Sequence, residues 1–152
     1  KYTGSLSEYN GILAKGGAAN IEIYCTIFKQ EAEVEGVRVE VAFTQAMLET
    51  GFLKFGGDVK PDQYNFAGGI SGEKFSDVRE GIRAQIQHLK CYASDAALNN
   101  ACVDPRWGTW LRNKALYVQW LSKANNPYGI GWATDAEYSE KILSMIKSLK
   151  AN

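Results

Sequence analysis

The 152-residue chain has few of the residues that would mark several classes of protein: one histidine, three cysteines and three prolines. No apolar run approaches the roughly 20 residues that a membrane-spanning helix needs, so we expect no insertion into a bilayer. Its 17 basic and 17 acidic residues cancel. Nucleic acid is therefore not an expected partner, and a neutral polymer suits the charge balance better.

Sulfur and imidazole chemistry are also poorly supported. Cys25, Cys91 and Cys102 form an odd set without CxxC or Cys–His spacing, which argues against a zinc site and a dense disulfide framework. Cys91 and Cys102 could close a loop in an oxidising setting, but free thiols are the default expectation. We interpret His88 as a helix-face or hydrogen-bonded residue. No metal and no organic cofactor is expected.

What the chain does have is ample material for one core. Hydrophobic residues make up 45% of it and aromatic residues 12%, which fits a single domain over residues 1–152 that folds by itself as a monomer. The chain begins at Lys1. We expect it to be a domain excised from a longer secreted protein.

Helical periodicity predicts several amphipathic helices. The first covers 18–32 and ends in an acidic run that we interpret as a solvated face: Glu31, Glu33 and Glu35. Asp77 and Glu80 resemble a capping box for a helix that ends near Ala93. A further helix is predicted over 110–123, and a last one after a second capping box formed by Thr134 and Glu137. Between the helices, residues 52–77 are rich in glycine and predict a loop with a short hairpin.

Glu49 is a lone carboxylate at the end of the most apolar helix, 39–50. Gly51 supplies a left-handed stop, which puts Glu49 in the last turn, near the negative end of the helix dipole. Partial burial and the dipole each disfavour the anion and would raise the pKa of the carboxyl. A protonated Glu is what a general acid requires. An ordinary exposed C-terminal Glu is the alternative interpretation.

All four tryptophans lie in the last third of the chain. Their flat rings suit either a core or stacking on sugars. We expect Trp120 and Trp110 to lie in the core. Trp132 follows two glycines in Gly129–Ala133, where the backbone could approach a ligand, so we interpret Trp132 as a groove wall.

Three ordered segments resemble the signatures of family 73 glycoside hydrolases, which are bacterial endo-β-N-acetylglucosaminidases: QAMLETG at 45–51, NFAG at 65–68 and GWATDAEY at 131–138. Residues 75–90 and 102–107 are similar to the clostridial and bacillar branch. The resemblance implies an α+β, mainly helical, lysozyme-like fold, in which a helical lobe and a small β-hairpin lobe flank a substrate groove.

By this resemblance Glu49 would be the general acid that cleaves a β-1,4 bond of peptidoglycan on the reducing side of N-acetylglucosamine. Tyr138, which closes the third segment, would orient the substrate's acetamido group or stabilise developing charge. Asn65 would bind the acetamido group, Phe66 would pack under the hairpin, and Trp132 would stack on the glycan. We interpret Asp135 as structural. The protein would be secreted and associated with the cell wall.

The second catalytic group stays open. Glu73, in the predicted hairpin, is our candidate, ahead of Asp58 and Asp62; its alternative is an exposed turn residue paired with Lys74. A distant base would favour inversion through water, and without one the substrate's acetamido group would be the nucleophile. The rival functions are a muramidase or lytic transglycosylase on the same fold, and a glycan-binding module without turnover.

Overall fold

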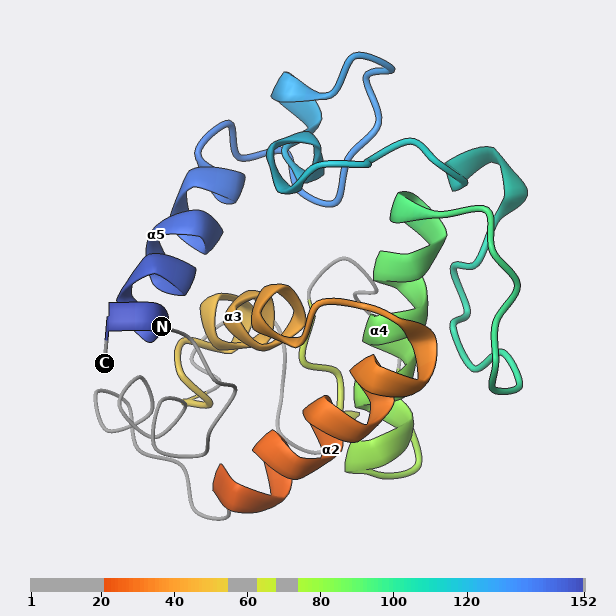
Figure 1. Ribbon diagram of the computed structural model, residues 1–152, viewed down its shortest axis with the longest axis vertical. Helices are drawn as coiled ribbons and strands as arrows, with labels where there is room; N and C mark the ends of the chain where they lie inside the picture. Colours follow the sequence, from red (N-terminus) through yellow and green to blue (C-terminus); the bar gives the residue numbers. More distant parts are fainter. Residues whose placement is uncertain (1–20, 55–62, 68–73, 152) are drawn as a thin grey trace.

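The computed structural model describes residues 21–54, 63–67 and 74–151. In chain order its α-helices are α2 (Ile21–Glu35), α3 (Val39–Thr50), α4 (Val78–Ala93) and α5 (Tyr138–Ala151). Three short 3-10 turns lie between α4 and α5: η3 (Thr109–Leu111), η4 (Val118–Leu121) and η5 (Lys123–Asn125). Helix α3 lies in the middle, with α5 on one side and the adjacent helices α2 and α4 on the other (Figure 1).

Helix α3 forms the centre of the core, as its apolar pattern predicts. Ala42, Phe43, Ala46 and Met47 are completely buried, and Phe43 packs edge-to-face on Phe28 of α2 with ring centroids 5.7 Å apart. Helix α3 also contacts α4 and α5. Helix α3, whose last turn carries Glu49, is therefore held by the three other described α-helices.

The predicted ends of α4 are confirmed. Asp77 is its N-cap, and its Oδ1 accepts from the backbone N–H of Glu80 at 2.8 Å. The Glu80 carboxylate reaches back to the N–H of Ser76 rather than that of Asp77. Helix α5 begins at Tyr138. Just before it, the backbone N–H of Glu137 donates to Asp135 Oδ1 and not to the side chain of Thr134. Asp135 has the structural role that we expected, while the predicted Thr134 cap is wrong.

The acidic run at the end of α2 is not a solvated face, which corrects our prediction. Only Glu33 is exposed. Glu31 is 2% exposed and binds Arg79 and Arg83 of α4. Glu35 is 4% exposed. It accepts from Lys90 Nζ at 2.8 Å and from the backbone N–H groups of Asn99 and Asn100. The two carboxylates therefore tie α2 to α4 and to the loop after it.

These pairs predict how stability depends on pH. Burial alone would raise the pKa of Glu35, but the bond from Lys90 and those from two backbone N–H groups outweigh it and bring its pKa below 4.5. The unfolded chain then binds more protons than the folded one, so this stability is present above about pH 4.5 and is lost as pH falls through the lower folded pKa.

We expect Glu35→Gln to lower the free energy of unfolding at pH 7 by about 2 kcal/mol. It should also flatten the fall in stability between pH 5 and 3, to be measured by urea unfolding at each pH. The matched control is Glu33→Gln, an exposed carboxylate on the same helix, which should leave both quantities unchanged. A Glu35→Gln curve parallel to that of the wild type would contradict the assignment.

The predicted helix over 110–123 is wrong, because the segment forms separate 3-10 turns. Asn113 adopts a left-handed φ of 59°, which interrupts helical geometry. Leu111, Ala115 and Leu121 are buried, but Leu116 and Tyr117 are exposed, so the apolar residues do not form one helical face. Trp120 packs partly buried against the core, whereas Trp110 is 65% exposed and is not a core residue.

The predicted hairpin lobe falls largely outside the described residues. The described parts of the chain contain no strand beyond an isolated bridge between Ser122 and Ala133. Within the glycine-rich segment, 63–67 lies on α4 at Gly81, where a Cβ atom would come within 1.6 Å of the Tyr64 carbonyl oxygen. Only glycine permits this close approach, which places Asn65 and Phe66 on the core.

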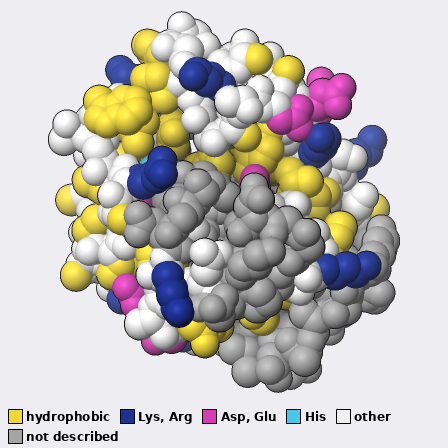
Figure 2. Space-filling view, turned by 180° about the vertical axis from the view of Figure 1, so that it is seen from behind, with side chains coloured by type: hydrophobic (Ala, Val, Ile, Leu, Met, Phe, Trp, Pro, Cys, Tyr) yellow, Lys and Arg dark blue, Asp and Glu magenta, His cyan; other side chains and the backbone are white. Residues whose placement is uncertain are grey.

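The surface is mixed in charge. Lys and Arg side chains are scattered among neutral and apolar ones on the described part of the face in Figure 2. None of the described helices has the length and apolar character needed to cross a membrane. Cys91 and Cys102 are free thiols, as we expected from the sequence, and Cys91 is buried.

Candidate functional site around Glu49 and Tyr138

Glu49 is the penultimate residue of α3 and is partly buried. The helix stops just after it in a Schellman motif: Gly51 has φ 58° and ψ 50°, its N–H bonds to the Leu48 carbonyl, and the Phe52 N–H bonds to the Met47 carbonyl at 2.8 Å. The predicted left-handed stop is confirmed. It fixes the last helical turn, and with it the point from which the Glu49 side chain leaves the helix.

The chain stays left-handed for two residues beyond Gly51. Phe52 and Leu53 have φ values of 59° and 63°, which are uncommon for side chains with a Cβ. Thr50 supports this turn, because its Oγ1 donates to the Ala46 carbonyl at 2.7 Å and accepts from the Leu53 N–H at 2.9 Å. The backbone therefore changes direction directly after α3, and Glu49 stays in the last turn of the helix.

Tyr138, the first residue of α5, is brought to Glu49 by the packing of α5 on α3. Its ring is 3% exposed. Its hydroxyl oxygen accepts from Gln45 Nε2 at 2.9 Å, and the hydroxyl also hydrogen-bonds to the Glu49 side chain. The structure thus joins two of the predicted catalytic residues.

The ionisation of Tyr138 follows from these contacts. Burial raises the pKa of Tyr138 well above its ordinary value, and the negative charge of Glu49 raises it further; the hydrogen bond from Gln45 acts in the opposite direction. The phenol therefore keeps its proton across the neutral range. Its proton is therefore available to Glu49, and a hydrogen bond donated by the phenol stabilises the carboxylate anion.

Asn65 and Phe66 are each 1% exposed. Asn65 Oδ1 accepts from the Ala67 N–H at 3.2 Å, and the Phe66 ring packs edge-to-face on Tyr24 at 5.3 Å. Phe66 is therefore a core residue, and it anchors segment 63–67 on Tyr24 of α2. The predicted contact of Asn65 with an acetamido group stays a prediction.

Trp132 lies in the core, which differs from the groove wall that we predicted. Its ring is 8% exposed and packs against His88 and Tyr92, with centroids 4.7 and 5.9 Å away. His88 itself is buried, and its Nδ1 lies 2.8 Å from Asp104 Oδ2. This confirms His88 as a hydrogen-bonded structural residue. Trp132 offers no open face for a sugar ring.

The glycine beside Trp132 explains the difference. At Gly131 a Cβ atom would lie 2.6 Å from the backbone nitrogen of Lys123 and 2.9 Å from the Leu121 carbonyl oxygen. The neighbouring Trp132 N–H bonds to that carbonyl at 2.8 Å. The close backbone approach that we attributed to a ligand is made instead by the chain's own η4 and η5 turns.

Glu73, Asp58 and Asp62 lie outside the described residues, so the partner of Glu49 across a groove stays a prediction. Among the residues that the structure does describe, no group of three His, Cys, Asp or Glu side chains lies close enough to hold a metal ion.

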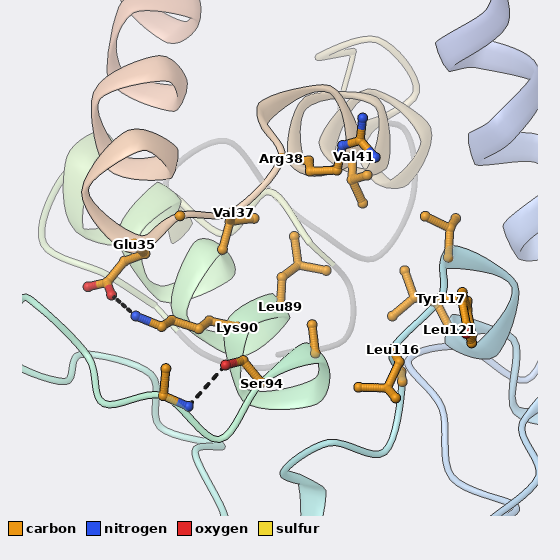
Figure 3. A pocket seen from close by; sticks show the side chains of 15 residues that line it. Glu35, Val37, Arg38, Val41, Leu89, Lys90, Ser94, Leu116, Tyr117 and Leu121 are labelled. Carbon is orange, nitrogen blue, oxygen red and sulfur yellow. Dashed lines mark hydrogen bonds and ion pairs between the residues drawn. The ribbon is translucent and has the colours of Figure 1, made fainter.

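A pocket of about 300 Å³ lies at the other end of α3 (Figure 3). Its walls are mainly apolar and include Val37, Val41, Leu89, Leu116 and Leu121, with the ion pair of Glu35 and Lys90 at one side. Val41 is eight residues before Glu49, about 12 Å along the helix axis. None of the predicted site residues lines this pocket, so it is separate from the Glu49 site.

Most of the chain matches a known protein family. The sequence profile of the glucosaminidase family, described as mannosyl-glycoprotein endo-β-N-acetylglucosaminidase, matches residues 25–151. The chain belongs to the glucosaminidase family. The resemblance to family 73 glycoside hydrolases is thereby confirmed, and the mainly helical architecture is compatible with a lysozyme-like glucosaminidase domain.

The glucosaminidase chain also resembles an uncharacterized protein of Borreliella burgdorferi, with 38% identity over 125 residues. The alignment covers 78% of this chain and 58% of that protein, so the match spans little more than half of the relative's length. No solved structure matches the chain.

Two residues of the candidate site around Glu49 were not predicted from the sequence, Gln45 and Gln85. Both are completely buried, and Gln85 Nε2 donates to Gln45 Oε1 at 2.9 Å. A signal was present, because each is a polar side chain within an otherwise apolar helical stripe, where an amide needs buried partners. Gln45 also lies one turn before Glu49, on the same face of α3.

Proposed function

We propose that this chain is an endo-β-N-acetylglucosaminidase that hydrolyses the β-1,4 bond between N-acetylglucosamine and N-acetylmuramic acid in bacterial peptidoglycan. Its membership of a glycoside hydrolase family supports the reaction class. The observation that carries the proposal is the Glu49 carboxyl, held at the end of a buried helix by the hydroxyl of Tyr138. We further propose that it acts outside the cell, on the wall.

In the proposed step Glu49 gives its proton to the glycosidic oxygen as the bond from the anomeric carbon to that oxygen breaks. The leaving sugar departs as a hydroxyl, and Glu49 is left as a carboxylate. Tyr138 donates to this carboxylate and so stabilises the charge as it forms. The oxygen of a water molecule then bonds to the anomeric carbon, and the proton that this water releases passes to the base or, where there is none, to the Glu49 carboxylate. Neither a metal nor a cofactor enters this step.

The second group follows one of two routes. If Glu73 faces Glu49 across a groove, it would act as the base that activates water, and the product would be inverted at the anomeric carbon. If no carboxylate approaches, the substrate's acetamido oxygen would attack first. In that case Glu73→Gln would cost much less activity than Glu49→Gln, whereas similar losses would support the two-carboxylate route.

The test of the proposed function is digestion of purified peptidoglycan, followed by borohydride reduction and mass spectrometry of the fragments. We expect reduced N-acetylglucosamine ends, because hydrolysis at that sugar frees its anomeric carbon. Reduced muramic acid ends would make the protein a muramidase, and anhydromuramic ends a lytic transglycosylase. Binding to peptidoglycan without any fragments would make it a glycan-binding module.

A further inference from the structure

A chain of four buried or partly buried side chains leads through the core to Glu49. It begins at Gln85 on α4, passes through Gln45 on α3 to Tyr138 on α5, and ends at Glu49. Gln85 and Gln45 are 0% exposed and Tyr138 is 3% exposed. Helices α3, α4 and α5 are therefore connected by a series of hydrogen bonds that is shielded from water.

The donor and the acceptor of each amide hydrogen bond in this series are fixed by the contact of Gln85 with Ala42. Gln85 Nε2 lies 2.8 Å from the backbone carbonyl oxygen of Ala42, which can only accept a hydrogen bond. The nitrogen of Gln85 must therefore face Ala42. The same nitrogen lies 2.9 Å from Gln45, so the atom that Gln45 presents to it must be its oxygen.

The argument continues to the phenol. Since Gln45 turns its oxygen to Gln85, it turns its nitrogen to Tyr138, and an amide nitrogen can only donate. The Tyr138 oxygen is thus an acceptor from Gln45. Its own proton is left for the other neighbour, Glu49. A single backbone carbonyl of α3 thereby sets where the hydroxyl proton of Tyr138 points.

The position of Gln85 lowers the stability of the fold, because one of its two polar side-chain atoms is left without a hydrogen bond to the described residues. The oxygen of Gln85 is buried and has no hydrogen-bond partner among the described residues. A buried acceptor without a partner destabilises the folded protein, because it loses its hydrogen bond to water and gains none. An apolar side chain at position 85 would avoid this cost, whereas Gln85 holds the Gln45 amide in one orientation.

We propose that Gln85 and Gln45 are positioning residues, which aim the hydroxyl proton of Tyr138 at Glu49 throughout the reaction. This inference rests on the proposed role of Glu49 as general acid. Without the Gln85 amide, the Gln45 side chain could turn its oxygen to Tyr138 and compete with Glu49 for the proton. The carboxylate that forms as the glycosidic bond breaks would then lose its donor.

The kinetic test is a double-mutant cycle on peptidoglycan hydrolysis. We expect Tyr138→Phe to lower kcat about 30-fold and Gln85→Met about tenfold, with KM nearly unchanged, because each acts on a bond to a charged group. In the Tyr138→Phe background, Gln85→Met should cost less than about twofold, since no hydroxyl proton remains to be aimed.

Gln87 on α4 is the matched control. It is equally buried and makes two hydrogen bonds, to the Ala101 carbonyl and from the Val103 N–H, which are not connected to Tyr138. Gln87→Met should lower stability like Gln85→Met but leave kcat unchanged. A tenfold loss from Gln85→Met in both backgrounds, or an equal loss in the Gln87 variant, would overturn the inference.

A second measurement does not depend on activity or on the folding of the Gln85 variant. At alkaline pH, where Glu49 is a carboxylate, the hydroxyl proton of Tyr138 should give a slowly exchanging, downfield NMR signal. That signal should move upfield in Glu49→Gln, because a neutral amide is a weaker acceptor than a carboxylate. An unmoved signal would overturn the inference. The proposed function fails separately, if Glu49→Gln hydrolyses peptidoglycan as fast as the wild type.

Discussion

Replacing Glu49 by Gln should reduce the kcat for peptidoglycan hydrolysis by about 1,000-fold or more, because general acid catalysis is worth roughly 10²–10⁴-fold and the amide has no acidic proton to transfer. The substitution keeps the size and shape of the side chain, and Tyr138 can still donate to the amide oxygen. We therefore expect a free energy of unfolding within about 1 kcal/mol of the wild type and unchanged binding to insoluble peptidoglycan.

The control for this prediction is Glu33→Gln, an exposed carboxylate on α2 that should leave kcat at the wild-type value. Activity is measured from the release of reducing ends, and binding from co-sedimentation with the wall. If Glu49→Gln kept more than a tenth of the wild-type kcat, the acid would have to be another residue. If it lost binding as well, Glu49 would serve the ground state.

The second large effect is expected at Trp132. Trp132→Ala should lower the free energy of unfolding by about 4 kcal/mol, because it empties a core site against His88 and Tyr92. We expect activity at low temperature to fall only as far as the folded fraction falls. Chemical denaturation, with kcat measured in parallel, checks both statements.

Trp132→Phe is the matched control. The indole Nε1 is buried without a hydrogen-bond partner among the described residues, so a phenyl ring retains most of the packing and loses no bond. It should cost much less stability than Trp132→Ala and leave kcat unchanged. A fully stable Trp132→Ala variant with weakened binding to peptidoglycan would instead restore Trp132 as a groove residue.

The errors of the sequence-based prediction share one cause. We predicted that Glu31 and Glu35 are solvated, because a run of three carboxylates needs either water or cations around it. The cationic side chains that pair with them, Arg83 and Lys90, lie on another helix, α4. Trp110 was assigned to the core and Trp132 to a groove wall, and the structure reverses both, because an aromatic ring is buried only where another element packs on it. The helix predicted over 110–123 came from apolar spacing, but the segment folds as 3-10 turns that leave Leu116 and Tyr117 exposed.

The sequence by itself determined the features that depend on near neighbours: the apolar pattern of α3, its stop at Gly51, the Asp77 cap of α4 and the family of the chain. Such features are local because helix periodicity and capping involve residues within about four positions. Only the tertiary structure decided that Gln45 meets Tyr138, 93 positions away, and that Gln85 sets the direction of their hydrogen bond. Those contacts depend on how α3, α4 and α5 pack, and packing brings together side chains that no local pattern connects.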